Sequence, residues 1–192
     1  MEDYITNPFI NELVHDYKIV QEKVLEEDPS TAQNLSVHLT KIMILMCASY
    51  YEQQLTEAYV EYAKGESDRY GDKPHGFDND QRNKSIYQKF QFGKIENPED
   101  YNQLPEIRKM LKPLEVFGEK FRDKLISEIE GDIEKEQQLK DFQELFALRN
   151  LLAHQTYVEF SSNKIRGKSF LDIKQMHDNA MKFVKYLKEK FK

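Results

Sequence analysis

Residues 135–153 read KEQQLKDFQELFALRNLLA, and this stretch decides the predicted fold class. Large apolar side chains recur in it every three or four residues, which is the spacing of one helix face. They are Leu139, Phe142, Leu145, Phe146 and Leu152. The stretch contains no glycine or proline that would interrupt a helix. We therefore predict an amphipathic helix that buries its apolar face against other helices.

Similar patterns on either side of this stretch predict further helices. We expect them over residues 8–27, 30–64, 106–130 and 170–191, with a shorter one at 79–90. Asp28-Pro29 is expected to end the first of these helices, and Ser30 or Thr31 to cap the second. Pro113 predicts a kink or a restart within the segment over residues 106–130.

The helix expected over residues 30–64 is the most apolar of the set. Its residues 42–48 are apolar all round, which predicts a place in the middle of a bundle or at an interface. Its expected core stripe comprises Leu35, Ile42, Leu45, Met46, Ser49 and Leu55. In the last helix, His177 falls in the apolar stripe, so we expect a hydrogen-bonded core histidine there rather than a metal ligand.

The composition favours a single all-α domain. The 192 residues include only 7 Gly and 6 Pro, too few for the turns of a β-sandwich or barrel of this length. We expect residues 1–192 to form one antiparallel bundle of four main helices with one or two short ones. No run of about 18 apolar residues is present, so we expect no membrane partner.

Few features of the sequence indicate a cofactor or an oxidising compartment. Cys47 is the only cysteine and cannot form an internal disulfide, so we expect a reducing, cytoplasmic setting. The sequence has no Gly-rich phosphate loop, no paired cysteines and no His-Glu-x-x-His motif. The histidines lack the spacing of metal ligands. We therefore expect neither a metal nor another cofactor.

The net charge of -6 hides an asymmetry along the chain. Residues 162–192 contain nine Lys or Arg and three Asp or Glu, a balance of +6, which leaves -12 for the remainder. Two interpretations of this tail stay open: a phosphate-facing surface, or a solvated helix face with lysines placed favourably near the helix end. The overall charge argues against a non-specific nucleic-acid binder.

Arg149 is the residue that stands out chemically. It shares the apolar face of its helix, because Leu145 precedes it by four residues and Leu152 follows it by three. An unpaired guanidinium there would be very costly, so we expect a carboxylate, an open cleft or a partner subunit beside it. Glu52, which follows the apolar run of the long helix, is one candidate partner.

Asn150 and His154 lie four residues apart on an adjacent face of the same helix. Together with Arg149 they gather a permanent cation, an amide and a titratable imidazole at one helix end. Such a set suits phosphodiester chemistry: Arg can hold a phosphate with two hydrogen bonds, His can move a proton near neutral pH, and Asn can orient either. The structural alternative is an ion pair at Arg149 and a helix-ending histidine.

The stretch Arg149-Asn150-Leu151-Leu152-Ala153-His154 resembles the signature of HEPN domains: Arg, four to six residues, then His, often with a polar residue after the Arg. The long early helix with Ser49-Tyr50-Tyr51-Glu52 is also similar to HEPN members, particularly the branch of bacterial RNase-LS-like and anti-phage toxins. The resemblance covers about residues 35–191.

The resemblance implies a helical bundle that usually dimerises, with two motifs facing each other across a cleft, and a metal-independent endoribonuclease. Arg149 and His154 would be catalytic and Asn150 supporting, with the RNA 2′-OH attacking the adjacent phosphate. RNA, a second copy of the chain, and an antitoxin or defence-system partner are the implied partners. We expect the basic residues that follow the motif to contact substrate. They are Lys164, Arg166 and Lys168.

One HEPN toxin subfamily carries a Tyr two residues after the His, which its nucleotidyltransferase antitoxin modifies. This sequence has Thr156 at that position and Tyr157 one residue later, so it departs from that pattern. Two alternatives to a ribonuclease remain: a non-catalytic module that dimerises through residues 42–48 and 142–152, and a nucleotide-binding regulator. The surroundings of Arg149 and His154 are the geometric test.

Overall fold

Helices make up every regular element in the part of the chain that the computed structural model describes, namely residues 8–70, 107–112, 114, 119–154 and 167–191. In chain order they are α1 (Pro8–Ile19), the π-helical turn η1 (Val20–Val24), α2 (Leu25–Glu27), α3 (Pro29–Tyr70), α5 (Ile107–Met110), α6 (Glu119–Ile129), α7 (Ile133–His154) and α8 (Phe170–Lys190). The predicted all-α fold is confirmed. The helix expected at residues 79–90 lies outside the described residues.

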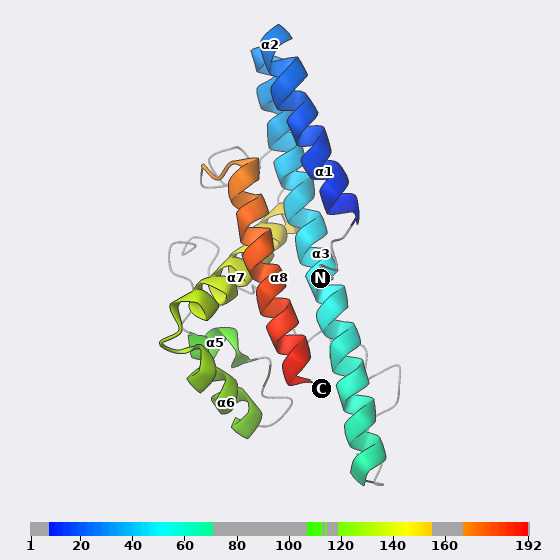
Figure 1. The fold of residues 1–192 in the computed structure, drawn as a ribbon, viewed down its shortest axis with the longest axis vertical. Helices are drawn as coiled ribbons and strands as arrows, with labels where there is room; N and C mark the ends of the chain where they lie inside the picture. The colour runs from blue at the N-terminus through cyan, green and yellow to red at the C-terminus, as the bar shows by residue number, and fades with distance from the viewer. Residues whose placement is uncertain (1–7, 71–106, 113, 115–118, 155–166, 192) are drawn as a thin grey trace, which may run out of the picture.

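The long helix α3 is the element against which α1, α7 and α8 pack (Figure 1). Its 42 residues span about 63 Å at 1.5 Å per residue. The segment from α1 to α2 folds back along the first half of α3, and α8 packs against both α3 and α7. The segment from α1 to α2 runs antiparallel to α3, whereas α3 and α8 run in the same direction (Figure 1). Helix α7 crosses obliquely behind α8 and carries the candidate motif at its far end.

The turn between α2 and α3 corrects one sequence prediction. Asp28 has an extended backbone, with φ -144° and ψ 90°, and so ends the first helical segment as expected. Its Oδ1 accepts hydrogen bonds from the backbone N–H groups of Ser30 and Thr31, both at 3.1 Å. The cap is therefore Asp28 rather than Ser30 or Thr31. Pro29 occupies the first helical position, where its missing N–H costs nothing, and this places the cap one residue before it.

The buried face of α3 differs from the predicted stripe. Its core residues are Met43, Ile44, Cys47, Ala48, Tyr51, Leu55 and Ala58. Four residues of the predicted stripe are instead exposed, Leu35 at 38%, Ile42 at 39%, Leu45 at 36% and also Ser49, while Leu55 is buried as expected. The prediction failed because a run that is apolar all round does not mark a single face. The helix also continues to Tyr70, beyond the expected end at residue 64.

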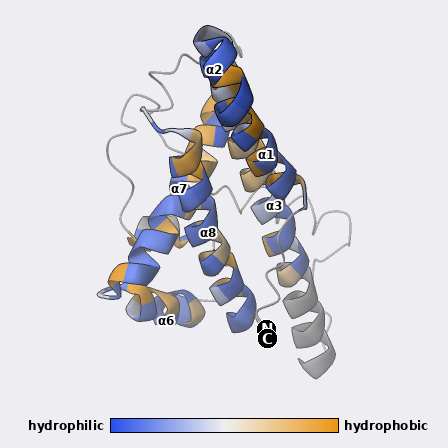
Figure 2. Ribbon diagram, turned by 45° about the horizontal axis from the view of Figure 1, so that its top comes forward, coloured by the Kyte–Doolittle hydropathy of each residue, from blue (hydrophilic) through white to orange (hydrophobic). Residues whose placement is uncertain are grey.

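The other helices bury the stripes that the sequence indicates. Phe142, Leu145 and Phe146 of α7 pack into one core with Phe183 and Leu187 of α8. Apolar and polar residues occupy different sides of α6 and α8 (Figure 2). No helix among the described residues is long and apolar enough to cross a membrane.

Turn chemistry sets the starts of α7 and α8. Gly131 adopts φ 88°, which allows the sharp break between α6 and α7. At the start of α8, the Ser169 side chain accepts a hydrogen bond from the Asp172 backbone, while the Asp172 side chain accepts one from the Ser169 backbone. This capping box fixes where α8 begins. The segment over residues 106–130 is interrupted between Met110 and Glu119, in agreement with the predicted restart.

Candidate active site

Arg149 leaves α7 on the side that faces α3. Leu145, Phe146 and Leu152, three or four residues away on the same helix face, are buried, yet 35% of the Arg149 side chain remains exposed. The prediction that Arg149 projects from the apolar face is therefore confirmed. Its guanidinium lies at the border of the core, in partial contact with solvent.

Glu52 of α3 is the carboxylate that meets this guanidinium. Nη2 of Arg149 lies 3.5 Å from Oε2 of Glu52, and the Glu52 side chain is 33% exposed. Nη1 of Arg149 donates a hydrogen bond to Oδ1 of Asn150 at 3.1 Å. Glu52 was named from the sequence as a candidate partner, and the structure bears this out. The pair borders solvent, so Arg149 is not sealed inside the protein.

Sequence-predicted site residues are not all within the described part of the chain. His154 is the last residue of α7, but its side chain lies outside the described residues, as do Lys164 and Arg166. Lys168 is described, and its Nζ lies 3.3 Å from Oε1 of Glu144. The structure thus brings Arg149, Asn150 and Glu52 together and gives Lys168 a carboxylate partner on α7.

Tyr51, the residue before Glu52, is completely buried where α3, α7 and α8 meet. Its hydroxyl hydrogen-bonds Nδ1 of His177 on α8 and lies 3.2 Å from the His177 carbonyl oxygen. Its ring stacks on the His177 ring at 5.7 Å and contacts Phe142 and Phe146 of α7. Sequence reasoning expected His177 to be a hydrogen-bonded core residue but did not pair it with Tyr51. A buried polar atom needs a partner, but no local pattern shows which residue, 126 positions away, supplies it.

Burial controls the protonation of Tyr51, His177 and the nearby Cys47. It lowers the pKa of His177 to about 4 and raises the pKa of the Tyr51 phenol well above its ordinary value. Burial also raises the pKa of the Cys47 thiol to about 12, and this thiol is hydrogen-bonded to Tyr51. All three groups are therefore neutral near pH 7. For Tyr51 to donate to Nδ1, neutral His177 must carry its proton on Nε2.

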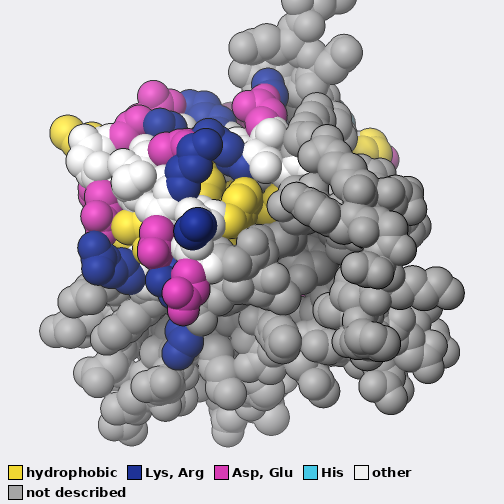
Figure 3. Space-filling model, turned by 90° about the horizontal axis from the view of Figure 1, so that it is seen from below, with side chains coloured by type: hydrophobic (Ala, Val, Ile, Leu, Met, Phe, Trp, Pro, Cys, Tyr) yellow, Lys and Arg dark blue, Asp and Glu magenta, His cyan; other side chains and the backbone are white. Residues whose placement is uncertain are grey.

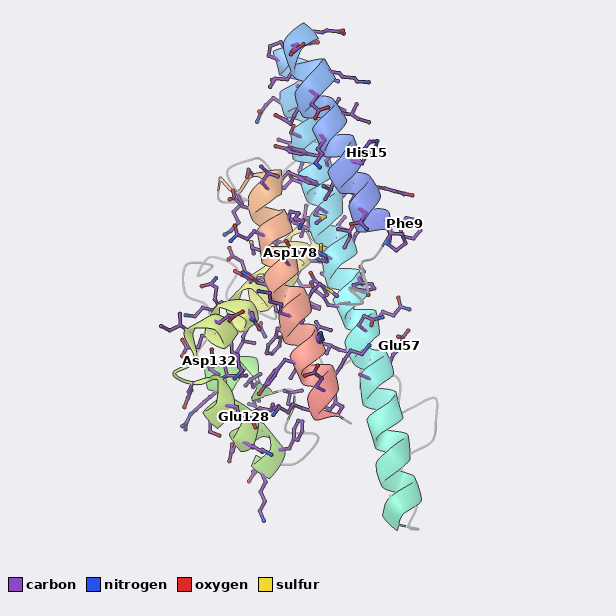
Figure 4. The ribbon with its side chains drawn as sticks, in the orientation of Figure 1. Phe9, His15, Glu57, Glu128, Asp132 and Asp178 are labelled. Atoms are coloured by element: carbon purple, nitrogen blue, oxygen red, sulfur yellow. The ribbon has the colours of Figure 1, made fainter. Side chains whose placement is uncertain are left out.

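The lysines of α8 are largely engaged within the chain. Lys182 pairs with Glu134, Lys190 with Glu128, and Lys174 with Asp178 of α8 itself. Figure 4 labels Glu128 at the end of α6 and Asp178 on α8. In the described part of the face in Figure 3, basic and acidic side chains are intermingled. This favours the interpretation of the basic tail as a charge-compensated helix face over a phosphate-binding surface.

The two surfaces considered for dimerisation are mainly core. Within residues 42–48, Met43, Ile44, Cys47 and Ala48 are buried inside the chain, which leaves Ile42 and Leu45 as the large exposed residues. Most of residues 142–152 are likewise buried. An apolar pattern alone does not distinguish an internal contact from a contact between subunits, and the buried residues of both segments serve the internal core. Among the histidines, His15 on α1 is exposed (Figure 4).

A family model described as RiboL-PSP-HEPN matches residues 10–192. The match covers nearly the whole chain, so the chain belongs to this family of HEPN domains. No curated protein and no solved structure shows a significant match to it. Among the described residues, no group of three or more His, Cys, Asp or Glu side chains is arranged to hold a metal ion.

Proposed function

We propose that residues 1–192 form one HEPN domain that acts as a metal-independent endoribonuclease, in the cytoplasm, as a toxin or anti-phage defence effector. Arg149 and His154 are the catalytic residues in this proposal and Asn150 supports them. The observation that carries it is the position of Arg149: it ends up beside the core yet 35% exposed, with Asn150 and Glu52 on its guanidinium. Membership of the HEPN family supports the same assignment.

The proposed chemistry is an internal transfer within RNA. The 2′-OH loses its proton and attacks the adjacent phosphorus, the bond from phosphorus to the 5′ oxygen breaks, and that oxygen takes up a proton. The products are a cyclic phosphate and a 5′-OH. His154 assists proton transfer, and Arg149 stabilises the negative charge that develops on the phosphorane oxygens. In a dimer, two copies of His154 divide the acid and base roles.

Glu52 has a role in this scheme that follows from its geometry. It holds the Arg149 side chain at the junction of α3 and α7 before RNA binds. A flexible arginine would lose more conformational freedom on binding the phosphate, so a carboxylate that keeps it in place lowers the cost of reaching the transition state. Because Nη2 is 3.5 Å from the carboxylate, the contact is loose enough to share the guanidinium with a phosphate.

Cleavage of a mixed RNA pool by the purified protein, in EDTA, tests the proposal. We expect cleavage products with cyclic phosphate ends, and a loss of at least about 100-fold in rate for Arg149→Ala and His154→Ala. Arg122→Ala is the matched control, because Arg122 pairs with the exposed Asp123 on α6. Full activity in His154→Ala would sink the assignment.

A non-catalytic HEPN module is the second candidate, and the Arg149–Glu52 ion pair favours it, since a structural pair alone accounts for a cation on the apolar face. It predicts that Arg149→Ala and Glu52→Ala change stability but that neither the wild-type protein nor any variant cleaves RNA. The same assay, with folding checked by circular dichroism, separates the two.

A further inference from the structure

Tyr51 occupies a position from which it can control the candidate site without touching substrate. It is buried completely, whereas the next residue, Glu52, reaches the surface and binds Arg149. Successive residues of a helix are about 100° apart around its axis, so the rotation of α3 that buries Tyr51 also sets the direction of Glu52. A rotation of α3 that moves Tyr51 would therefore also move Glu52 relative to Arg149.

The seating of Tyr51 depends on α8. Its hydroxyl hydrogen-bonds Nδ1 of His177, and its ring stacks on the imidazole. The other side of the tyrosine meets Phe142 and Phe146, which belong to the helix that carries Arg149. One phenol thus joins the helix of Glu52, the helix of Arg149 and the C-terminal helix α8. Helix α8 contributes no residue of its own to the Arg149–Glu52 pair.

We infer that the Tyr51–His177 hydrogen bond is a positioning element of the site: it locks α3 against α8 in the rotation that presents Glu52 to Arg149. This inference rests on the proposed ribonuclease function. Tyr51 and His177 are positioning residues and act through Glu52. Without the hydroxyl, the buried Nδ1 of His177 loses its hydrogen-bond partner, and a shift of α8 against α3 that relieves this loss would alter the contact that sets the ion pair.

The kinetic test uses three variants and a matched control. Tyr51→Phe removes the hydroxyl but keeps the ring, and we expect kcat to fall about 10-fold with KM unchanged, because a displaced arginine lowers stabilisation of the transition state. His177→Leu should do the same, whereas His177→Asn, which offers an acceptor near the position of Nδ1, should restore most of the rate. Tyr186→Phe removes a phenol hydrogen bond of 2.7 Å from α8 to Glu128, away from the site, and should leave kcat unchanged.

A double variant tests the route through Glu52. If Tyr51 acts by placing that carboxylate, Tyr51→Phe combined with Glu52→Gln should be no slower than Glu52→Gln alone. The inference would be overturned if the double variant lost kcat by the product of the two single-variant factors. It would also be overturned if Tyr186→Phe and Tyr51→Phe lost kcat equally. Wild-type kcat in Tyr51→Phe would overturn it as well.

A second readout does not need activity. The side-chain ¹⁵N resonance of Arg149, assigned with Arg149→Lys, should move in Tyr51→Phe and in His177→Leu but not in Tyr186→Phe. If the wild-type protein cleaves no RNA but the resonance responds in this way, the ribonuclease proposal fails and the positioning element stands. If the Arg149 resonance moves in neither Tyr51→Phe nor His177→Leu, the positioning element is contradicted, whatever the activity.

Discussion

Arg149 of α7 and Glu52 of α3 form an ion pair in which both side chains keep about a third of their surface in water. This partial exposure determines what the pair can contribute to folding. Water screens the attraction between the charges, and ordering two long side chains costs entropy, so such pairs contribute little stability. The pair therefore matters more for where the guanidinium is held than for how strongly it holds the fold.

Glu52→Gln should accordingly leave the fold nearly as stable as the wild type. We expect a loss of no more than about 1 kcal/mol in the free energy of unfolding, measured by urea titration. Lys182→Gln, which removes a more exposed pair with Glu134, is the control. A loss above about 3 kcal/mol for Glu52→Gln would mean that Arg149 is left as an uncompensated buried charge, contrary to its exposure.

Arg149→Lys should abolish most RNA cleavage even though it keeps the positive charge. Lysine offers a single ammonium, whereas Arg149 uses Nη2 toward Glu52 and Nη1 toward Asn150 at once. We expect a fall of at least about 100-fold in the rate. The control is Arg122→Lys on α6. Near-wild-type cleavage by Arg149→Lys would show that charge alone is enough.

The pH dependence of stability should reveal the lowered pKa of the buried His177 imidazole. Burial lowers its pKa from 6.5 to about 4 in the folded protein, so between these values only the unfolded chain is protonated at this position. Stability is therefore complete above pH 6.5 and falls as the pH drops toward 4, by about 3 kcal/mol in total. Urea titrations at several pH values should show this slope in the wild type and a much flatter one in His177→Asn. Equal slopes in both proteins would contradict the assignment.

The capping box of α8 should show its own pH window. Hydrogen bonds from the Ser169 backbone and side chain lower the pKa of Asp172 below 3.8, so its contribution is present above that value and lost as the pH falls through the folded pKa. Ser169→Ala should cost about 1 kcal/mol at pH 7 and less in acid. Ser127→Ala, an exposed serine within α6, should cost little. An equal cost for both serines would mean that the cap does not stabilise α8.

Gly131 offers a test of backbone strain without a steric clash. Its φ is 88°, and a Cβ built there meets nothing within 4 Å. Gly131→Ala should therefore destabilise the protein by about 1 kcal/mol through conformation alone, and Gly131→Asn by less, since Asn tolerates positive φ better. Thermal unfolding of the two variants shows which of them is the more stable. Alanine equal to or better than asparagine would contradict this account.

The sequence predicted the fold through its helix periods. Residues 135–153 and 170–191 have large apolar residues at helical spacing, and both helices formed nearly where expected. The buried face of α3 was misassigned because residues 42–48 are apolar on every side, so only the packing of the neighbouring helices decides which of them face inward. The capping residue before Pro29 was missed by two or three positions for a local reason, the lack of an N–H on proline.

The candidate site was predictable in part. The apolar neighbours of Arg149 showed that it needs a partner, and Glu52 was a reasonable candidate because both residues flank buried runs. The link from Tyr51 to His177 spans 126 residues, and no local pattern indicates such a contact. Lys168 was expected to contact RNA, whereas the structure pairs it with Glu144, a residue of α7 that is distant in sequence.

The interior contact between Tyr51 and His177 also bears on how this chain can diversify. Losing the hydroxyl at position 51 leaves the buried imidazole of His177 without this partner, whereas losing the imidazole leaves the hydroxyl its bond to the backbone carbonyl of residue 177. Phe at position 51 should therefore be accompanied by an apolar residue at position 177 across related sequences.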